Sequence, residues 1–256
     1  MVKRSEKLET MIHYLLLAVL ALLFLLPLLW MLIASIDPGA IQTLKLPEAV
    51  SFENFASILS DQTIIRSFGI GLLLSGCQSI LVVVLCVLAA YPLSRYQLRY
   101  KKSFLMAVLF MTSLPMTAVI VPVYQLFIFL KFQDSLLAVT FFLTASSLPY
   151  GIWMMKNFMD SVPIDLEESA WVDGASTWQG VRKVVAPLMV PGICTVGIFT
   201  FTGSWGNFFV PYILIQSPEK MPASVSIFQF FGNFGMVNYG RLAAFSVLYT
   251  LSLIHI

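Results

Sequence analysis

The sequence predicts an all-α, polytopic membrane protein, and its composition is the first reason. Hydrophobic residues make up 59% of the 256 residues, charged residues only 11%, and the mean hydropathy is +0.87. Soluble domains are far more polar. A bilayer core of about 30 Å needs about 20 apolar residues in a helix. Six stretches approach this length, and we expect each to span the membrane: 12–34, 66–90, 103–127, 136–156, 191–215 and 241–256.

The two ends of the chain need separate interpretation. Basic residues precede the first apolar stretch, as in a signal peptide, but no small-residue cleavage site follows before Asp37. We therefore expect a cytoplasmic tail at 1–11 and one transmembrane domain at 12–256. Residues 241–256 would rise only about 24 Å as a helix, so we expect the sixth span to be truncated, as a fragment or an artefact.

The basic residues predict the orientation, because they concentrate in cytoplasmic loops. Most of the lysines and arginines fall on one side of the predicted spans: Lys3, Arg4, Lys7, Arg95, Arg99, Lys101, Lys102, Lys156, Arg182 and Lys183. The amino terminus and the loop 157–190 should therefore be cytoplasmic. The net charge of +2 gives no reason to expect nucleic acid as a partner.

A polar segment at 163–191 interrupts the apolar sequence. Its charged side chains are Asp165, Glu167, Glu168, Asp173, Arg182 and Lys183. Each would cost about 2.5–3.5 kcal/mol at the bilayer centre, so the segment should lie outside it. A first helix is predicted at 163–173, with Gly174 as a left-handed stop. Ser176 and Gln179 have capping-box spacing for a second helix, which Pro187 should end.

No catalytic or metal site is predicted. His13 and His255 are the only histidines, and no HExxH, G-x-S-x-G or Walker A motif occurs, so any ATPase must be another polypeptide. Cys77, Cys86 and Cys194 lack metal-site spacing and are expected to pack among apolar side chains.

The polar segment resembles the EAA loop of inner-membrane permease subunits of binding-protein-dependent ABC importers. Glu168, Ala170, Asp173-Gly174-Ala175, Pro187-Leu188 and Pro191 match the pattern in register. Ser169 replaces an Ala of the pattern, Val181 replaces a common Phe, and Ala186 replaces a common Leu. The segments 89–95, 120–124 and 162–168 extend the resemblance to the MalG-like carbohydrate branch.

The resemblance implies a sugar importer in the bacterial inner membrane. Its partners would be an ATPase subunit dimer that binds ATP and Mg, a second, MalF-like permease subunit, an extracytoplasmic solute-binding protein, and membrane lipid. The residues expected to couple this chain to the ATPase are Glu168, Ser169, Ala170, Asp173, Gly174, Ala175 and Pro187. The sugar itself is not predicted.

A solute pathway should show small or polar residues and broken helix within the spans. Two segments qualify: Ser146 and Ser147, which precede Pro149, and 203–207, which contains Trp205 and Asn207. Helix packing is the alternative role for these residues. The family usually has Trp-Asn-Glu/Asp-Phe where this chain has Trp205-Gly206-Asn207-Phe208.

Three further expectations concern packing and alternatives. Gly71, Ser75 and Ser79 form a small-residue stripe that should pack on a helix of this chain or of a partner. The segment 35–61 should be external, with a short helix at 52–59, and 216–240 is also external. A membrane-surface loop is the alternative for the polar segment, and a secondary carrier or scaffold is the alternative for the whole protein.

Overall fold

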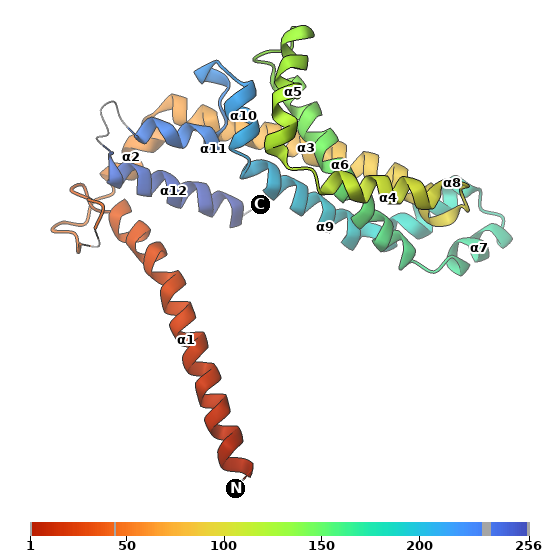
Figure 1. Cartoon of the computed structure of the whole chain (residues 1–256), viewed down its shortest axis with the longest axis horizontal. Helices are drawn as coiled ribbons and strands as arrows, with labels where there is room; N and C mark the ends of the chain where they lie inside the picture. Colours follow the sequence, from red (N-terminus) through yellow and green to blue (C-terminus); the bar gives the residue numbers. More distant parts are fainter. Residues whose placement is uncertain (1, 44, 232–236, 255–256) are drawn as a thin grey trace. The chain divides into compact units, whose positions relative to one another are not determined.

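The computed structural model describes residues 2–43, 45–231 and 237–254, with side chains given for Lys7 and from Glu9 onward within these ranges. The described chain is built almost entirely of helices (Figure 1). It divides into two compact units, which are treated separately here. Unit 1 comprises residues 1–65 and 226–256, and unit 2 comprises residues 66–225.

Unit 1 joins the two ends of the chain. Its helices are α1 (Val2–Ser35), α2 (Glu53–Ser60), the 3-10 helix η3 (Ile227–Phe230) and α12 (Tyr239–Ile254). Helix α12 packs against α1 and α2. The approach to α2 requires a glycine at Gly240, because a Cβ there would lie 2.6 Å from Asn54 Nδ2. Asn54 in turn donates to the carbonyls of Ser35 and Asp37, at 3.2 and 3.1 Å, and so fixes the segment that follows α1.

Unit 2 contains the rest of the helices. They are α3 (Gln62–Arg95, which begins in unit 1), α4 (Lys101–Thr112), α5 (Met116–Phe129), α6 (Leu136–Asp160), α7 (Asp165–Val172), α8 (Thr177–Gly180), the π-helix η1 (Val181–Val185), α9 (Ala186–Trp205), α10 (Phe209–Leu214), the 3-10 helix η2 (Pro218–Lys220) and α11 (Ala223–Ser226, which ends in unit 1). Two buried apolar clusters hold them together. One surrounds Leu143 and Val210, and the other surrounds Met155 and Val185.

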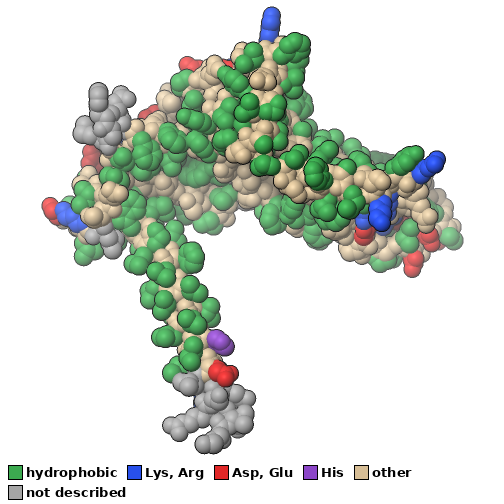
Figure 2. All heavy atoms as spheres, in the orientation of Figure 1, with side chains coloured by type: hydrophobic (Ala, Val, Ile, Leu, Met, Phe, Trp, Pro, Cys, Tyr) green, Lys and Arg blue, Asp and Glu red, His purple; other side chains and the backbone are tan. Residues whose placement is uncertain are grey.

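Fewer long apolar helices occur than the six predicted spans. Four helices in the described residues are long and apolar enough to cross a membrane: Glu9–Ser35, Gln62–Arg95, Leu136–Asp160 and Thr177–Trp205. A fifth is counted if α4 and α5 form one bent span. Helix α12 is apolar but shorter, and His255 lies outside the described residues. Hydrophobic side chains cover the visible face of α1 (Figure 2), and none of its apolar window is buried in the chain.

The predicted third span at 103–127 is not one straight helix, but a pair of helices separated by a sharp bend. Helices α4 and α5 meet at a bend of 95°. Pro115 is the cause, since a proline disfavours the helical conformation of the residue before it and lacks the N–H that would continue the ladder. It takes an extended conformation, with ψ 130°, immediately before α5.

The predicted end of the second loop helix at Pro187 is wrong, whereas the span predicted at 191–215 is present with different bounds. The chain is helical from Thr177 to Trp205, through α8, η1 and α9. In a regular α-helix the Pro187 ring would clash with the carbonyl of Lys183. The wider π turn just before it, in which the Ala186 amide donates to the Val181 carbonyl, accommodates the ring. The span therefore begins earlier than predicted and ends at Trp205.

The small-residue stripe packs on a helix of the same chain. A Cβ on Gly71 would lie 3.1 Å from the Trp205 ring. Ser79 Oγ donates to the Gly197 carbonyl at 2.8 Å and accepts from Thr200 Oγ1 at 3.2 Å. The stripe on α3 is thus an intramolecular contact with α9. The short helix expected at 52–59 is confirmed as α2, whereas residues 232–236 of the segment 216–240 lie outside the described residues.

The packing expected for the cysteines is confirmed for Cys86 alone. Cys86 is buried in the second apolar cluster, while Cys77 and Cys194 are exposed and none of the three forms a disulfide. In the described part of the chain, no group of three or more His, Cys, Asp or Glu residues could hold a metal ion.

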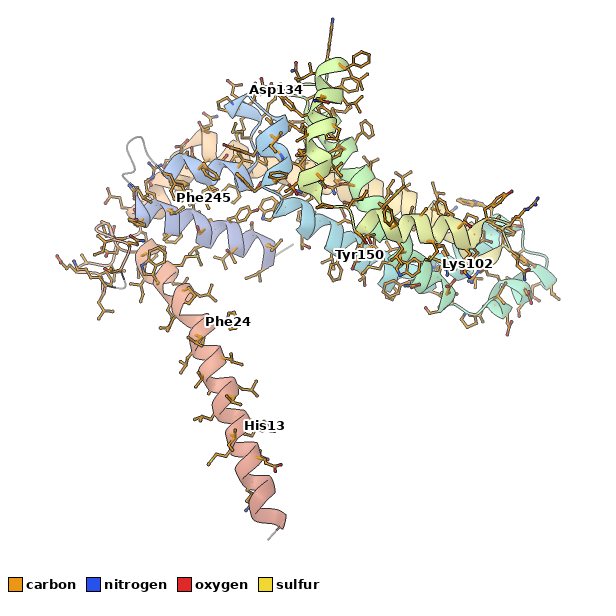
Figure 3. All side chains as sticks on the ribbon, viewed as in Figure 1. His13, Phe24, Lys102, Asp134, Tyr150 and Phe245 are labelled. Carbon is orange, nitrogen blue, oxygen red and sulfur yellow. The ribbon has the colours of Figure 1, made fainter. Side chains whose placement is uncertain are left out.

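Asp134, labelled in Figure 3, lies in the turn before α6 and connects it to the segment 216–220. Its carboxylate accepts hydrogen bonds from Lys220 Nζ at 2.7 Å, from the Ser217 hydroxyl at 2.5 Å, and from the amides of Ser217 and Gln216 at 2.9 and 3.0 Å. Lys220 also donates to the Asp134 carbonyl. The Lys220 ammonium, followed by the Ser217 hydroxyl and amide, holds the pKa of Asp134 below its ordinary value.

We expect Asp134→Asn to lower the free energy of unfolding by about 1–2 kcal/mol at pH 7, because hydrogen bonds to a charged acceptor are lost. A folded-state pKa below the unfolded one adds stability above the unfolded pKa, and this stability is lost as the pH falls toward the folded pKa. The difference between the native chain and the variant should therefore shrink between pH 7 and pH 3 in detergent unfolding experiments. Glu48→Gln, which removes an exposed surface pair with Lys45, is the control. A difference that does not change with pH would contradict the prediction.

Candidate functional site

The coupling loop, defined here as residues 163–180, begins with α7. Asp165, Glu167 and Glu168 lie in the first turn of this helix, where the helix dipole favours anions. The helix ends in a Schellman motif: the Ala175 amide donates to the Ala170 carbonyl at 2.9 Å, and the Gly174 amide donates to the Trp171 carbonyl at 3.0 Å. Gly174 has φ 88°, as the motif requires. The predicted glycine stop is confirmed.

The second half of the coupling loop is fixed by the predicted capping box. The Gln179 amide donates to Ser176 Oγ at 3.3 Å, and the Ser176 amide donates to Gln179 Oε1 at 2.8 Å. Trp171 ties the two halves together, because its indole covers Gly180 so closely that a Cβ there would lie 3.1 Å from Trp171 Nε1. The turn between α7 and α8 is therefore rigidly built.

The predicted coupling residues lie together on this loop, except for Pro187. Glu168, Ser169, Asp173 and Gly174 are exposed, while Ala170 and Ala175 are half-buried. Two large apolar side chains are exposed beside them: Val172 is 87% exposed and Trp178 is 70% exposed. Carboxylates next to protruding apolar side chains form a surface that a protein with a basic, partly apolar groove could bind. Pro187 lies beyond η1, in the first turn of α9.

The residue that the sequence analysis missed is Glu167. Its side chain is 0% exposed and forms an ion pair with Arg95, at the end of α3, whose side chain is 7% exposed. Tyr91 Oη donates to the second carboxylate oxygen of Glu167 at 3.1 Å. Arg95 also donates to the carbonyls of Met159 and Val162, at 3.3 and 3.1 Å. One buried arginine thus joins the end of α3, the end of α6 and the start of α7.

A second site is a cavity of ≈ 330 Å³ within unit 2. It contains three of the four predicted pathway residues, namely Ser146, Ser147 and Asn207, together with Gln78, Tyr150, Thr200, Gly203 and Ser204. The side chain of Tyr150, labelled in Figure 3, forms an edge contact with Phe199, with ring centroids 6.5 Å apart. The walls of the cavity thus combine aromatic rings with hydroxyl and amide groups.

The fourth predicted pathway residue, Trp205, lies elsewhere. It is buried, with 3% exposed, and packs against Gly71, Phe68 and Phe201. Packing, the alternative considered from the sequence, describes Trp205 better than contact with a solute. The expected helix break lies at Gly206 and Asn207, between α9 and α10, whereas α6 runs unbroken through Pro149.

Two buried polar atoms in the cavity wall have no hydrogen-bond partner among the described residues: Gln78 Oε1 and Ser204 Oγ. The Gln78 side chain is held in place by its Nε2, which donates to Ser147 Oγ at 3.0 Å and to the Leu143 carbonyl at 3.2 Å. An unpaired buried polar atom costs about 1–3 kcal/mol. The cavity therefore favours a ligand that can donate and accept hydrogen bonds.

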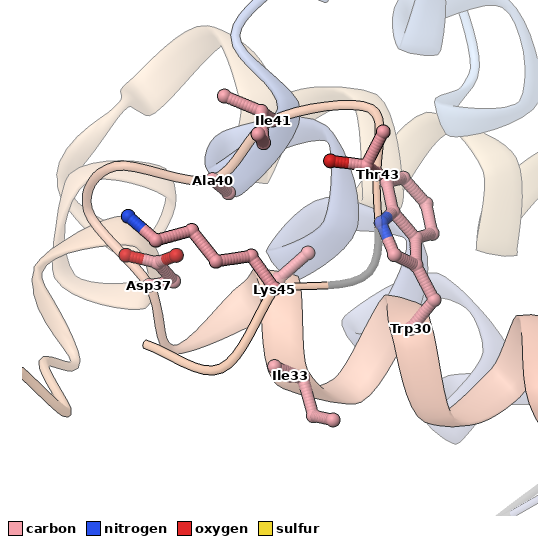
Figure 4. Close-up of a pocket in the computed structure, with 8 residues that line it drawn as sticks. Trp30, Ile33, Asp37, Ala40, Ile41, Thr43 and Lys45 are labelled. Atoms are coloured by element: carbon pink, nitrogen blue, oxygen red, sulfur yellow. The ribbon is translucent and has the colours of Figure 1, made fainter. Parts of the chain in front are cut away.

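Unit 1 has a pocket of its own, but a very small one (Figure 4). Trp30, Asp37, Thr43 and Lys45 line it, and its volume is ≈ 10 Å³. This is room for about one water molecule. Such a water could accept from Trp30 Nε1, which has no partner in the described part of the chain. The pocket is too small for an organic solute.

These features define a class of protein: a multi-pass membrane protein with a polar helical loop outside its spans and a partly polar cavity between its helices. The comparison with known families makes the assignment specific. Residues 7–256 match the family described as "Binding-protein-dependent transport system inner membrane component", and the chain belongs to that family.

Two relatives are named as permeases of transport systems for sugars or sugar derivatives. The sulfoquinovosyl glycerol transport system permease protein SmoH of Agrobacterium fabrum is 30% identical over 215 residues, which cover 80% of this chain and 74% of SmoH. The trehalose transport system permease protein SugB of Mycobacterium tuberculosis is 30% identical over 239 residues, which cover 90% of this chain and 85% of SugB.

A solved structure has the same fold. One chain of a bacterial ABC transporter involved in the import of the acidic polysaccharide alginate superposes with a TM-score of 0.85, at 21% identity, over 98% of this chain and 95% of that chain. The all-α permease fold predicted from the sequence is thereby confirmed.

Proposed function

We propose that this chain is a permease subunit of an ATP-driven importer of sugars in the bacterial inner membrane. Its partners would be an ATPase subunit dimer that binds ATP and Mg, a second, MalF-like permease subunit and an extracytoplasmic solute-binding protein. Two observations support this proposal. Relatives at 30% identity are named for sugar transport. A second structure with the same fold, at a TM-score of 0.69, is a bacterial alginate ABC transporter in complex with a periplasmic protein that carries an alginate pentasaccharide. Family membership favours the importer over a secondary carrier or scaffold.

The mechanism we propose is alternating access. The coupling loop would lie in the cytoplasm with the amino terminus, as the basic residues predict. Glu168 and Asp173, exposed on this loop, would bind the ATPase, and the rigid turn at Gly174 would transmit the ATPase movement to α9. Each conformation would expose the cavity to one side of the membrane, so the solute must bind both states.

The observation that carries the sugar assignment is the chemistry of the cavity. Sugars have hydroxyl groups that both donate and accept, and flat C–H faces that pack on aromatic rings. Gln78 Oε1 and Ser204 Oγ offer hydrogen bonds that the described residues leave unmade, and Tyr150 and Phe199 supply rings. A cavity of ≈ 330 Å³ has room for a monosaccharide unit.

The test is uptake of a panel of radiolabelled mono- and oligosaccharides by cells that carry the complete transporter. Gln78→Leu keeps about the same volume but removes the amide, and we expect it to reduce the transport of the accepted sugar about two- to tenfold, since the one bond lost to the sugar costs about 0.5–1.5 kcal/mol. Gln125→Leu, the same change at an exposed position of α5, is the control. Unchanged uptake by Gln78→Leu, or uptake of no sugar on the panel by the native transporter, would count against the proposal.

A further inference from the structure

A separate cavity of ≈ 480 Å³ lies at the start of α4, facing α6. It is distinct in composition from the polar cavity described above. Three of its lining residues are basic, namely Arg99, Lys101 and Lys102, and four are large and apolar, namely Leu98, Leu105, Met106 and Trp153. Figure 3 labels Lys102 at this end of α4. No acidic residue lines the cavity.

The three basic side chains are not neutralised within the described chain. None of them takes part in an ion pair with the described carboxylates. The nearby carboxylate of Asp160 is already bonded to Lys156 and to Ser94. The first turn of α4 contains no acidic residue, although the positive end of a helix dipole disfavours two lysines there. Lys101 does interact electrostatically with Asp160, but this carboxylate is paired with Lys156, so the cavity keeps an excess of positive charge.

The charged and apolar parts of the cavity lie at different levels along the helix. Leu105 follows Lys101 by four residues, and Met106 follows Lys102 by four residues, so each pair shares one face of α4 about one turn, or about 5.4 Å, apart. Trp153 adds an indole from α6 to the lining. The cations at the start of α4 match the headgroup of a lipid, and the apolar side chains one turn further along α4 match the start of its acyl chain.

We propose that this cavity binds an anionic phospholipid, with its phosphate on Arg99, Lys101 and Lys102 and its acyl chain along Leu105, Met106 and Trp153. A free phosphate ion would satisfy the charges but leave the apolar half of the cavity unfilled. The positive-inside distribution places these residues at the cytoplasmic surface, where anionic lipids attract basic residues. The lipid would hold the α3–α4 turn at the membrane surface.

The test uses the full chain in nanodiscs of phosphatidylcholine that contain either dibrominated phosphatidylglycerol or dibrominated phosphatidylcholine. Bromine quenches tryptophan fluorescence on contact, and the share due to Trp153 is obtained by comparison with Trp153→Phe. We expect brominated phosphatidylglycerol to quench Trp153 at lower mole fraction than brominated phosphatidylcholine. The triple variant R99Q/K101Q/K102Q should lose this preference, with about a fivefold loss of affinity for each charge removed. K131Q/R182Q/K183Q, which removes three basic residues outside the cavity, should keep it.

A second measurement does not depend on fluorescence. Native mass spectrometry of the purified chain should show co-purified phosphatidylglycerol that the R99Q/K101Q/K102Q variant lacks and the control variant keeps. Equal quenching by the two brominated lipids would overturn the proposal. So would a Trp153 response to inorganic phosphate in lipid-free detergent that matches the response to phosphatidylglycerol, since the ligand would then be a soluble anion. Loss of ATPase binding by the triple variant with unchanged lipid preference would assign the three cations to a protein contact instead.

Discussion

Replacement of Arg95 by leucine is expected to lower the free energy of unfolding by about 3–5 kcal/mol, because it leaves Glu167 buried without its partner. The side chain of Glu167 is 0% exposed, so water cannot take over from the guanidinium. The carbonyls of Met159 and Val162 would lose their donor as well. The coupling loop would then be held to α3 only through weaker contacts. Chemical unfolding in detergent, together with the rate of proteolysis within 163–180, measures both effects.

The double variant Arg95→Leu, Glu167→Leu separates the ion pair from general packing. If the buried charge is the cause, removal of both partners should recover much of the stability lost in Arg95→Leu, since an apolar pair of similar volume is often tolerated. Arg182→Leu, the same change at an exposed position outside both cavities, should change little. A double variant as unstable as Arg95→Leu would show that the arginine stabilises the loop in another way.

Charge reversal at the neighbouring residue, Glu168→Lys, should abolish retention of the ATPase while leaving the fold intact. Glu168 is exposed in the first turn of α7, and the described residues give it no ion pair. Replacement of a carboxylate by an ammonium against a basic surface replaces attraction by repulsion, which costs several kcal/mol at an interface. Co-purification of the ATPase and the second permease subunit with this chain, in detergent, gives the measurement.

The control for this experiment is Glu219→Lys, a charge reversal in η2. Glu219 is exposed and lies 3.5 Å from Arg66, which is near the start of α3, whereas Arg95 is at its end. Retention of the ATPase should be unaffected by this change. If Glu168→Lys retains the ATPase as well as the native chain does, α7 does not provide the contact that we propose.

The contrast between Glu167 and Glu168 shows what the sequence could and could not predict. The position of α7, its glycine stop and the Ser176 capping box follow from local rules, and the structure has all three. The two glutamates are chemically identical and adjacent in sequence, so local rules treat them alike. Which of them is buried depends on Tyr91 and Arg95, more than 70 residues earlier, and no local rule gives that pairing.

The effect of a proline on a helix is also hard to predict from the local sequence. The sequence analysis interpreted Pro187 as the end of a helix and did not predict a break at Pro115. In the structure, Pro115 separates two helices and Pro187 lies inside a continuous one. A proline excludes the regular ladder, but whether the chain bends or widens by one residue depends on the packing around it. Val185, the last residue of η1 and two residues before Pro187, is buried in the second apolar cluster. Packing in this cluster favours continuation of the helix.

The continuous helix from Thr177 to Trp205 has a mechanical consequence. Its 29 residues span about 43 Å, at about 1.5 Å per residue, from the coupling loop to the wall of the polar cavity. A continuous helix of this length resists bending, so it would act as a lever: a tilt applied at the Ser176 cap would be transmitted to Ser204. Its one irregular turn, at Val181–Val185, is the place where the lever can twist. The proposed ATPase contact and the proposed solute cavity are therefore connected by one piece of secondary structure.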